Sequence, residues 1–237
     1  MEQPVTSAAF AYRNLRQKIL RGELKPGERL RINELTEQLG VSNSPIIEAM
    51  RRLEHDGLVE SRPNVGVRVQ QWSAEDIASA ILTREALEGI AARLFVLQAN
   101  EAQCEKLTLL NQNFHQAIRE QNDPLLWIEA DAAFHQHIFD SIRSRPLVKA
   151  ASNSFAISIT FWNINTEKRR AFPAPPASVH DELILALQGD DPAAAEQAAR
   201  DHVHKGLDVA AARGIFGKHV KETIAFMREG VRREQVK

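Results

Sequence analysis

The sequence predicts a mainly α-helical protein in two parts: an N-terminal winged helix-turn-helix with a small β-ribbon, and a C-terminal all-α antiparallel bundle. Three observations predict it. The 237 residues are enough for two units. Short helical segments, a Gly-containing turn and two strand-like segments follow one another in residues 1–72. From Ser73 onward the apolar residues recur at helical spacing, so residues 73–237 form the second part.

Composition excludes several classes of protein. No apolar run reaches the ~18 residues of a membrane helix, and the first ten residues lack the basic-then-apolar order of a signal peptide. Cys104 is the only cysteine, which excludes disulfides within the chain and Cys-rich zinc sites. We therefore expect a cytoplasmic protein with no membrane partner. Residues 1–72 carry 11 basic and 9 acidic side chains, a balance too even to indicate nucleic-acid binding by itself.

The N-terminal part begins with a helix that ends at Arg21-Gly22. One face of this helix is apolar: Phe10, Leu15, Ile19 and Leu20. A second helix is expected over residues 32–39, with Gly40 as its C-terminal cap. Ser44 as N-cap, followed by Pro45, would open a third helix that runs to about residue 55.

Two strand-like segments, residues 58–61 and 66–70, follow the third helix and form a ribbon. In a winged helix-turn-helix the third helix enters the major groove by its N-terminal end, while the ribbon tip at residues 64–66 approaches the DNA backbone or the minor groove. The alternative is a small helical packing module with an incidental turn.

The second part is expected to be helical throughout, with breaks at proline, glycine and aspartate positions. An antiparallel bundle of this kind forms ligand sites between facing helices. The expected helices span residues 73–98, 101–121, 124–142, 146–166, 178–188, 192–213 and 219–233.

Four side chains of this bundle have the spacing of a metal site. Asp131 and His135 lie at i and i+4 on one helix face. His180 and His202 lie about equally far from the turn between their helices, so an antiparallel hairpin brings them to a similar height. Imidazole and carboxylate ligands suit a divalent transition metal. Ordinary core or surface histidines remain an equal alternative, and an open metal site would serve a sensor or an enzyme.

Arg84 lies in the first helix of the bundle and could offer its guanidinium to a carboxylate effector. The alternative is a solvated salt bridge with Glu88, one turn further on. His137 and His204 lie two residues from proposed ligands, so on a helix they point elsewhere.

These residues resemble a known family. The N-terminal part is similar to the winged-helix domain of the GntR superfamily, in the segments 19–30, 34–35, 39–42, 45, 48–50, 52–54 and 57–59. The second part resembles the FCD effector domain of the FadR subfamily, through Arg84-x-x-Leu87-Glu88, Asp131-x-x-Phe134-His135, His180-Asp181-Glu182 and Gly189-Asp190 ahead of His202.

The resemblance implies a homodimeric transcription regulator, a repressor in preference to an activator, that binds an imperfectly palindromic double-stranded DNA operator. A small organic acid bound to the FCD domain would change its DNA affinity. In metal-binding members the ligands are an Asp and three His, which correspond here to Asp131, His135, His180 and His202, and zinc or nickel is the expected ion. Arg84 corresponds to an arginine that faces the effector pocket.

The recognition helix departs from the family pattern. Asn43 and Ile47 occupy positions where relatives typically have arginine, so the operator is expected to differ from the family's usual one. Candidate DNA contacts are Arg31, Ser42, Asn43, Ser44, Arg51, Arg52 and Gly66.

Two other functions remain open at this stage. A metal-dependent enzyme on a helical bundle would need a general base or nucleophile near the metal, and none stands out, so we expect no enzyme. An interaction module that has lost DNA binding would explain the missing arginines.

Overall fold

The computed structural model describes residues 6–63, 65–120, 124–151 and 175–212, together with residues 222, 223 and 225. The chain divides near Ser73 into two compact units. Among the described residues, no helix is both long and apolar enough to cross a membrane.

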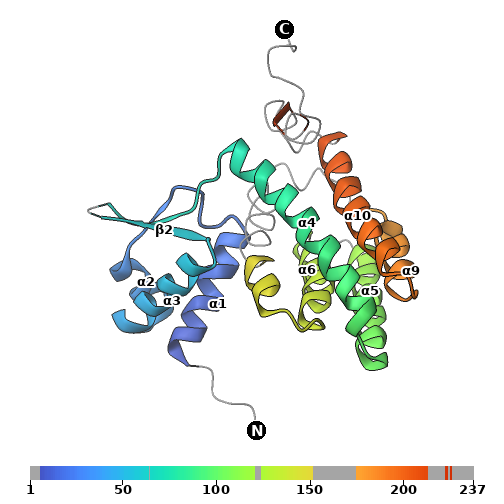
Figure 1. Cartoon of the computed structure of the whole chain (residues 1–237). Coiled ribbons are helices and arrows are strands. Elements are labelled where there is room, and N and C mark those ends of the chain that lie inside the picture. Colours follow the sequence, from blue (N-terminus) through green and yellow to red (C-terminus); the bar gives the residue numbers. More distant parts are fainter. Residues whose placement is uncertain are drawn as a thin grey trace. The chain divides into compact units, whose positions relative to one another are not determined.

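The first unit has three helices around one apolar core: α1 (Ser7–Leu20), α2 (Ile32–Leu39) and α3 (Asn43–His55). Helix α1 packs mainly on α3 (Figure 1). Leu15, Ile19 and Leu20 are buried as predicted, whereas Phe10 is 42% exposed because the buried face of α1 continues through Ala8 and Ala11 instead.

The helix-turn-helix begins α3 two residues earlier than expected. Ser42, not Ser44, occupies the N-cap position, with extended backbone angles. Pro45 then lies in the first turn of α3, where its missing N–H would have no helical partner in any case. The turn before it depends on Gly40, which caps α2 in the left-handed conformation, a conformation that glycine adopts without the steric penalty of a Cβ.

The ribbon is part of a three-stranded antiparallel sheet of order β1-β3-β2. Strands β2 (Val59–Arg62) and β3 (Gly66–Val69) form the hairpin, in which Val59 pairs with Val69. Strand β1 (Arg29–Leu30) adds to the other edge of β3. Strand β1 was not predicted, because two residues are too few to show alternation.

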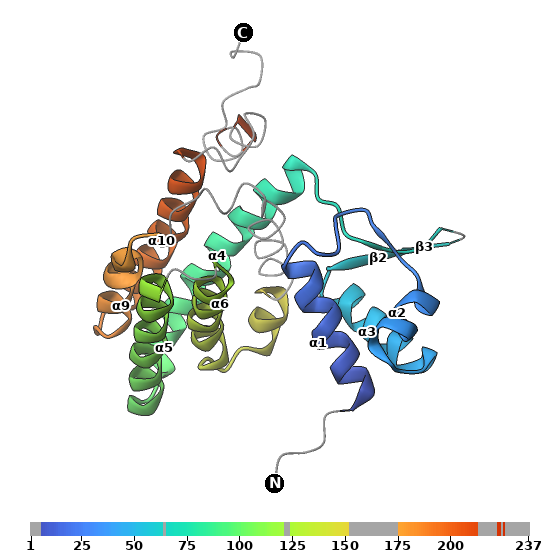
Figure 2. The same cartoon turned by 180° about the vertical axis from the view of Figure 1, so that it is seen from behind.

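The second unit is helical in the described residues. It contains α4 (Ala74–Gln98), α5 (Glu101–Glu120), α6 (Pro124–Asp140), the 3₁₀ turn η1 (Ala177–His180), α9 (Asp181–Leu187) and α10 (Pro192–Ala212). Helix α4 packs on α10 and α5 packs on α6, as the two opposite views show (Figures 1 and 2). The largest buried side chains of its core are Phe95, Phe114, Phe134 and Phe139.

Most expected helices of the bundle are present within a residue or two of their expected bounds. The helix expected over 146–166 is seen over residues 145–151. Its remainder, and most of the helix expected over 219–233, lie outside the described residues.

Candidate functional site

The four residues with metal-site spacing meet in the core of the second unit. Helix α6 contributes Asp131 and His135, η1 ends at His180, and α10 contributes His202. One nitrogen of each imidazole lies within 4.8 Å of the corresponding atom of the other two. The Nε2 atoms of His135 and His202 are 3.1 Å apart, and His180 Nε2 is 3.2 Å from Asp131 Oδ1.

The opposite nitrogen of each imidazole contacts an acceptor outside the cluster. His202 Nδ1 donates to the Val179 carbonyl at 3.1 Å, and His180 Nδ1 donates to Asn111 Oδ1 at 3.1 Å. His135 Nδ1 lies 3.1 Å from Glu88 Oε2. A carboxylate and a carbonyl only accept hydrogen bonds, so these partners favour the tautomer with the proton on Nδ1. Each Nε2 then presents its lone pair to the centre of the cluster.

Packing holds the rings in place. The Phe134 ring stacks on His180 at 4.2 Å between centroids and an interplanar angle of 15°, and Phe114 lies 4.4 Å from the same imidazole. His137 and His204 point away from the cluster, as expected. His137 Nε2 is 2.8 Å from the carbonyl of Gln103, and His204 Nε2 is 2.5 Å from Glu85 Oε2.

The surroundings keep His180 and His202 neutral and the Asp131 carboxylate ionised. Burial, reinforced by repulsion from His135 and His180, lowers the pKa of His202 to about 3. Burial also lowers the pKa of His180, against the attraction of Asp131. Although burial alone would raise it, hydrogen bonding from His180 and the charges of His135 and His180 hold the pKa of Asp131 well below its usual range. Neutral imidazole and ionised carboxylate are the protonation states that bind a metal ion.

The cluster fits a small transition-metal ion. Zinc–nitrogen bonds of ~2.0–2.1 Å in a tetrahedral site place ligand atoms roughly 3.3 Å apart. The 3.1 Å between His135 and His202 and the 3.2 Å between His180 and Asp131 are close to that separation, and the 3.8 Å between His135 Nε2 and Asp131 Oδ1 needs a small adjustment. Two lone pairs that face each other at such a distance are stabilised by a cation between them.

Arg84 lies beside this cluster, one turn before Glu88 on α4. The structure contains the predicted Arg84–Glu88 pair, but the pair is buried rather than solvated: the side chains are 14% and 4% exposed. Although burial alone would raise it, the charges of Arg84 and His135 lower the pKa of Glu88 to about 2. Although desolvation alone would lower it, the negative charges of Glu88 and Asp131 raise the pKa of the Arg84 guanidinium, so Arg84 interacts electrostatically with the cluster.

Sequence reasoning missed two residues here. Glu88 was recognised only as a partner of Arg84, although its other oxygen contacts a histidine of the cluster. Asn111 gave no signal, because it lies on α5, which contributes no proposed ligand.

The first unit exposes one face of α3. Asn43, Ile47 and Arg51 follow one another at i, i+4 and i+8, and all three are exposed. Ile47 is 38% exposed, so its side chain is available for an apolar contact on this face. Ser42 and Ser44 are exposed at the N-terminal end of the same helix, where backbone N–H groups suit a phosphate oxygen.

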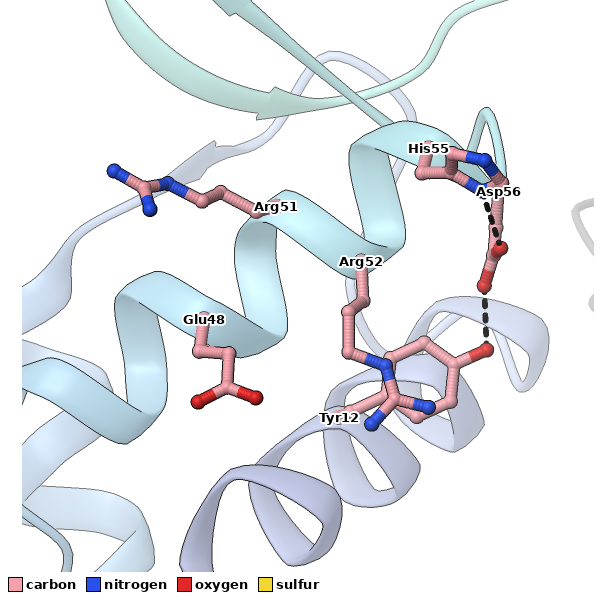
Figure 3. A pocket seen from close by; sticks show the side chains of 6 residues that line it. All are labelled: Tyr12, Glu48, Arg51, Arg52, His55 and Asp56. Atoms are coloured by element: carbon pink, nitrogen blue, oxygen red, sulfur yellow. Dashed lines mark hydrogen bonds and ion pairs between the residues drawn. The ribbon is translucent and has the colours of Figure 1, made fainter.

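The two arginines at the end of α3 have different surroundings. Arg52 lies over the Tyr12 ring of α1, with its guanidinium carbon 4.3 Å from the ring centroid, whereas Arg51 extends away from α1 (Figure 3). The Tyr12 hydroxyl donates to Asp56 at 2.5 Å. Burial and this hydrogen bond raise the pKa of Tyr12 to about 12. Asp56 thus holds the Tyr12 ring on which Arg52 packs, at the edge of a surface pocket that these residues line.

The other predicted contacts lie on loops and at the ribbon. Arg31 precedes α2 and pairs with Glu34 at 2.6 Å, with 62% of its side chain exposed. Gly66 begins β3 with φ +89°, and an added Cβ there would lie 3.4 Å from the Arg29 side chain. The backbone of the ribbon tip thus depends on glycine.

Comparison with known families and solved structures agrees with this architecture. Residues 7–69 match the family described as "Bacterial regulatory proteins, gntR family", and residues 79–205 match the FCD domain. Among solved structures, E. coli McbR/YncC has a TM-score of 0.73 and 20% identity, over 88% of this chain and 99% of that one, which is a likeness of fold.

Two curated relatives are similar over most of their length. The "Probable D-xylose utilization operon transcriptional repressor" of Paenarthrobacter nicotinovorans is 32% identical over 197 residues, which are 82% of this chain and 84% of the relative. The "HTH-type transcriptional repressor RspR" of Escherichia coli (strain K12) is 29% identical over 86% of this chain and 87% of the relative. The chain is a transcription regulator of the GntR family, with an FCD domain after its winged helix.

Proposed function

We propose that this regulator is a homodimeric repressor of the FadR subfamily whose affinity for its operator is controlled by a small organic acid at a metal site in the FCD domain. The observation that carries the proposal is the convergence of three imidazoles and one carboxylate beside a buried arginine. The repressor activity named for the two curated relatives supports the sign of regulation.

DNA recognition would use the exposed face of α3. Asn43, Ile47 and Arg51 share one stripe of the helix, so they are the residues that would face base edges. Ser42, Ser44 and the ribbon at Gly66 would meet the phosphate backbone. Arg31 and Arg52 would add phosphate contacts that set the position of the protein without reading sequence.

Asp131, His135, His180 and His202 would hold the metal ion. Their mixed nitrogen and oxygen donors favour zinc or nickel. When bound, the ion supplies a Lewis acid that attracts the carboxylate of an organic acid. The Arg84 guanidinium would bind the same carboxylate in a forked geometry, and the buried position of Arg84 would strengthen that contact because little water competes there.

DNA binding in the presence of chelators and organic acids tests the proposal. Fluorescence anisotropy should show tight binding to fragments from the gene's own neighbourhood, and at least one small organic acid should change that affinity in the metal-loaded protein. Chelation should abolish the response to the acid. A response that is unchanged after verified metal removal would contradict the role of the metal.

Matched variants on α10 test the ligand assignment. His202→Ala should weaken zinc binding by ~10–100-fold or more, because loss of a ligand is at least as serious as loss of a residue that orients one. His204→Ala lies two residues away and removes a histidine that contacts Glu85 instead, so its zinc affinity should match the wild type. Equal affinities of the two variants would contradict the assignment.

A further inference from the structure

Glu88 has two partners that belong to different parts of the site. Its Oε1 accepts a hydrogen bond from Arg84 Nε, and its Oε2 lies 3.1 Å from His135 Nδ1. The side chain is 4% exposed, so water does not replace a lost partner. One carboxylate therefore bridges the arginine proposed to bind the effector and a histidine proposed to bind the metal.

We propose that Glu88 is a positioning residue that holds His135 ready for metal and Arg84 ready for a carboxylate, so that the two binding events are coupled through it. This inference rests on the proposed metal site. Because the negatively charged Oε2 of Glu88 lies 3.1 Å from Nδ1 and a carboxylate offers no proton, Glu88 favours the His135 tautomer with its proton on Nδ1, which leaves Nε2 as the ligand atom. Such carboxylate–histidine pairs orient metal ligands and raise their basicity.

The coupling follows from the sharing of one anion. A cation bound at His135 Nε2 makes the Nδ1–H a stronger donor and strengthens its contact with Oε2. The stronger contact with His135 neutralises more of the negative charge of Glu88, so Glu88 attracts the Arg84 guanidinium less strongly. Arg84 can then bind an incoming carboxylate at a lower cost in free energy. By thermodynamic reciprocity, a carboxylate bound to Arg84 strengthens metal binding by the same factor.

The same helix carries a matched control. Glu85 has a closely similar set of partners, with Oε2 2.5 Å from His204 Nε2 and Oε1 3.8 Å from Arg200, and its side chain is 16% exposed. Its histidine is not part of the metal cluster. Glu85→Gln and Glu88→Gln therefore each remove one charge from a His–Glu–Arg arrangement on α4, and they differ in whether the histidine faces the metal.

Zinc affinity, measured by competition with a chromophoric chelator, tests the positioning of His135. Glu88→Gln should weaken zinc binding by ~10–100-fold, and Glu85→Gln should stay within about threefold of the wild type. Equal affinities for the wild type and both variants would overturn the inference and leave the metal site intact. A wild type that binds no zinc would instead contradict the proposed function.

Two further measurements separate positioning from mere structural support. Imidazole ¹⁵N spectra of the zinc-free protein should show His135 as the Nδ1–H tautomer in the wild type and in Glu85→Gln, and a mixture of tautomers in Glu88→Gln; an unchanged tautomer in the last would overturn the inference. Glu88→Asp serves as a second variant if Glu88→Gln does not fold. It keeps the charge, but its side chain is too short to reach both Arg84 and His135. Wild-type zinc affinity in Glu88→Asp would also overturn the inference.

A double variant tests the bridge to Arg84. Residues that share a partner give non-additive effects, so the zinc affinity of Arg84→Gln/Glu88→Gln should differ by about threefold or more from the product of the two single effects. An affinity equal to that product would show that Arg84 and Glu88 act separately, and would overturn the coupling.

Discussion

Acidification should destabilise the metal-free protein through the buried histidine cluster. The folded-state pKa of His202 is about 3, below the ~6.5 of an unfolded histidine. Between these values the unfolded chain binds a proton that the folded chain does not, so stability falls as the pH falls from about 6.5 toward 3. For this single group the loss between pH 7 and pH 5 is about 2 kcal/mol.

Urea unfolding of chelator-treated protein at several pH values measures this loss. His202→Gln removes the group, so its free energy of unfolding should fall by about 2 kcal/mol less than that of the wild type between pH 7 and pH 5. His204→Gln, on the same helix and outside the cluster, should keep the wild-type pH dependence. Parallel curves for the wild type and His202→Gln would refute the reasoning, because they would mean that His202 is protonated in the folded protein.

Three further predictions concern DNA binding and the effector. Asn43→Arg should move the sequence chosen by in vitro selection toward guanine at one position per half-site, since arginine prefers guanine and asparagine prefers adenine; identical consensus sequences would mean that residue 43 does not face the bases. Operator affinity should fall steeply with salt, because phosphate contacts release counterions, and a flat salt titration would contradict the proposed contacts. Arg84→Met should lose the thermal stabilisation produced by organic acids while it still binds zinc, whereas equal stabilisation of this variant and the wild type would remove Arg84 from the effector site.

Local signals predicted most of the fold. Helix ends are set by residues that act on the backbone within a few positions. Gly40 ends α2 in the left-handed conformation, and proline and aspartate residues separate the helices of the bundle, as observed. The errors have the same origin. Strand β1 is stabilised by pairing with β3, nearly forty residues later. Ser42 occupies the N-cap position in place of Ser44 although its side chain makes no capping hydrogen bond, so the hydroxyl on which the prediction relied does not decide where α3 begins.

The candidate site was predictable only in part for a similar reason. The i, i+4 spacing on one helix predicted that Asp131 and His135 lie together. Their similar distance from a helix turn predicted the same of His180 and His202. The residues that orient these imidazoles, Glu88 among them, come from other helices, so their role depends on tertiary packing. The burial of the Arg84–Glu88 pair could not be predicted either, because an i, i+4 ion pair has the same sequence pattern on the buried and on the exposed face of a helix.

Helix α4 connects the winged helix to the proposed effector site along the chain. It begins at Ala74, five residues after β3 ends at Val69, and it carries Arg84 and Glu88 ~15–21 Å along its axis from that start. A ligand shifts an equilibrium only by its difference in affinity for the two states. The effector must therefore have different affinities for the DNA-bound and released proteins. An exchange of Arg84 between Glu88 and an external carboxylate would supply such a difference, on the helix that follows the wing along the chain.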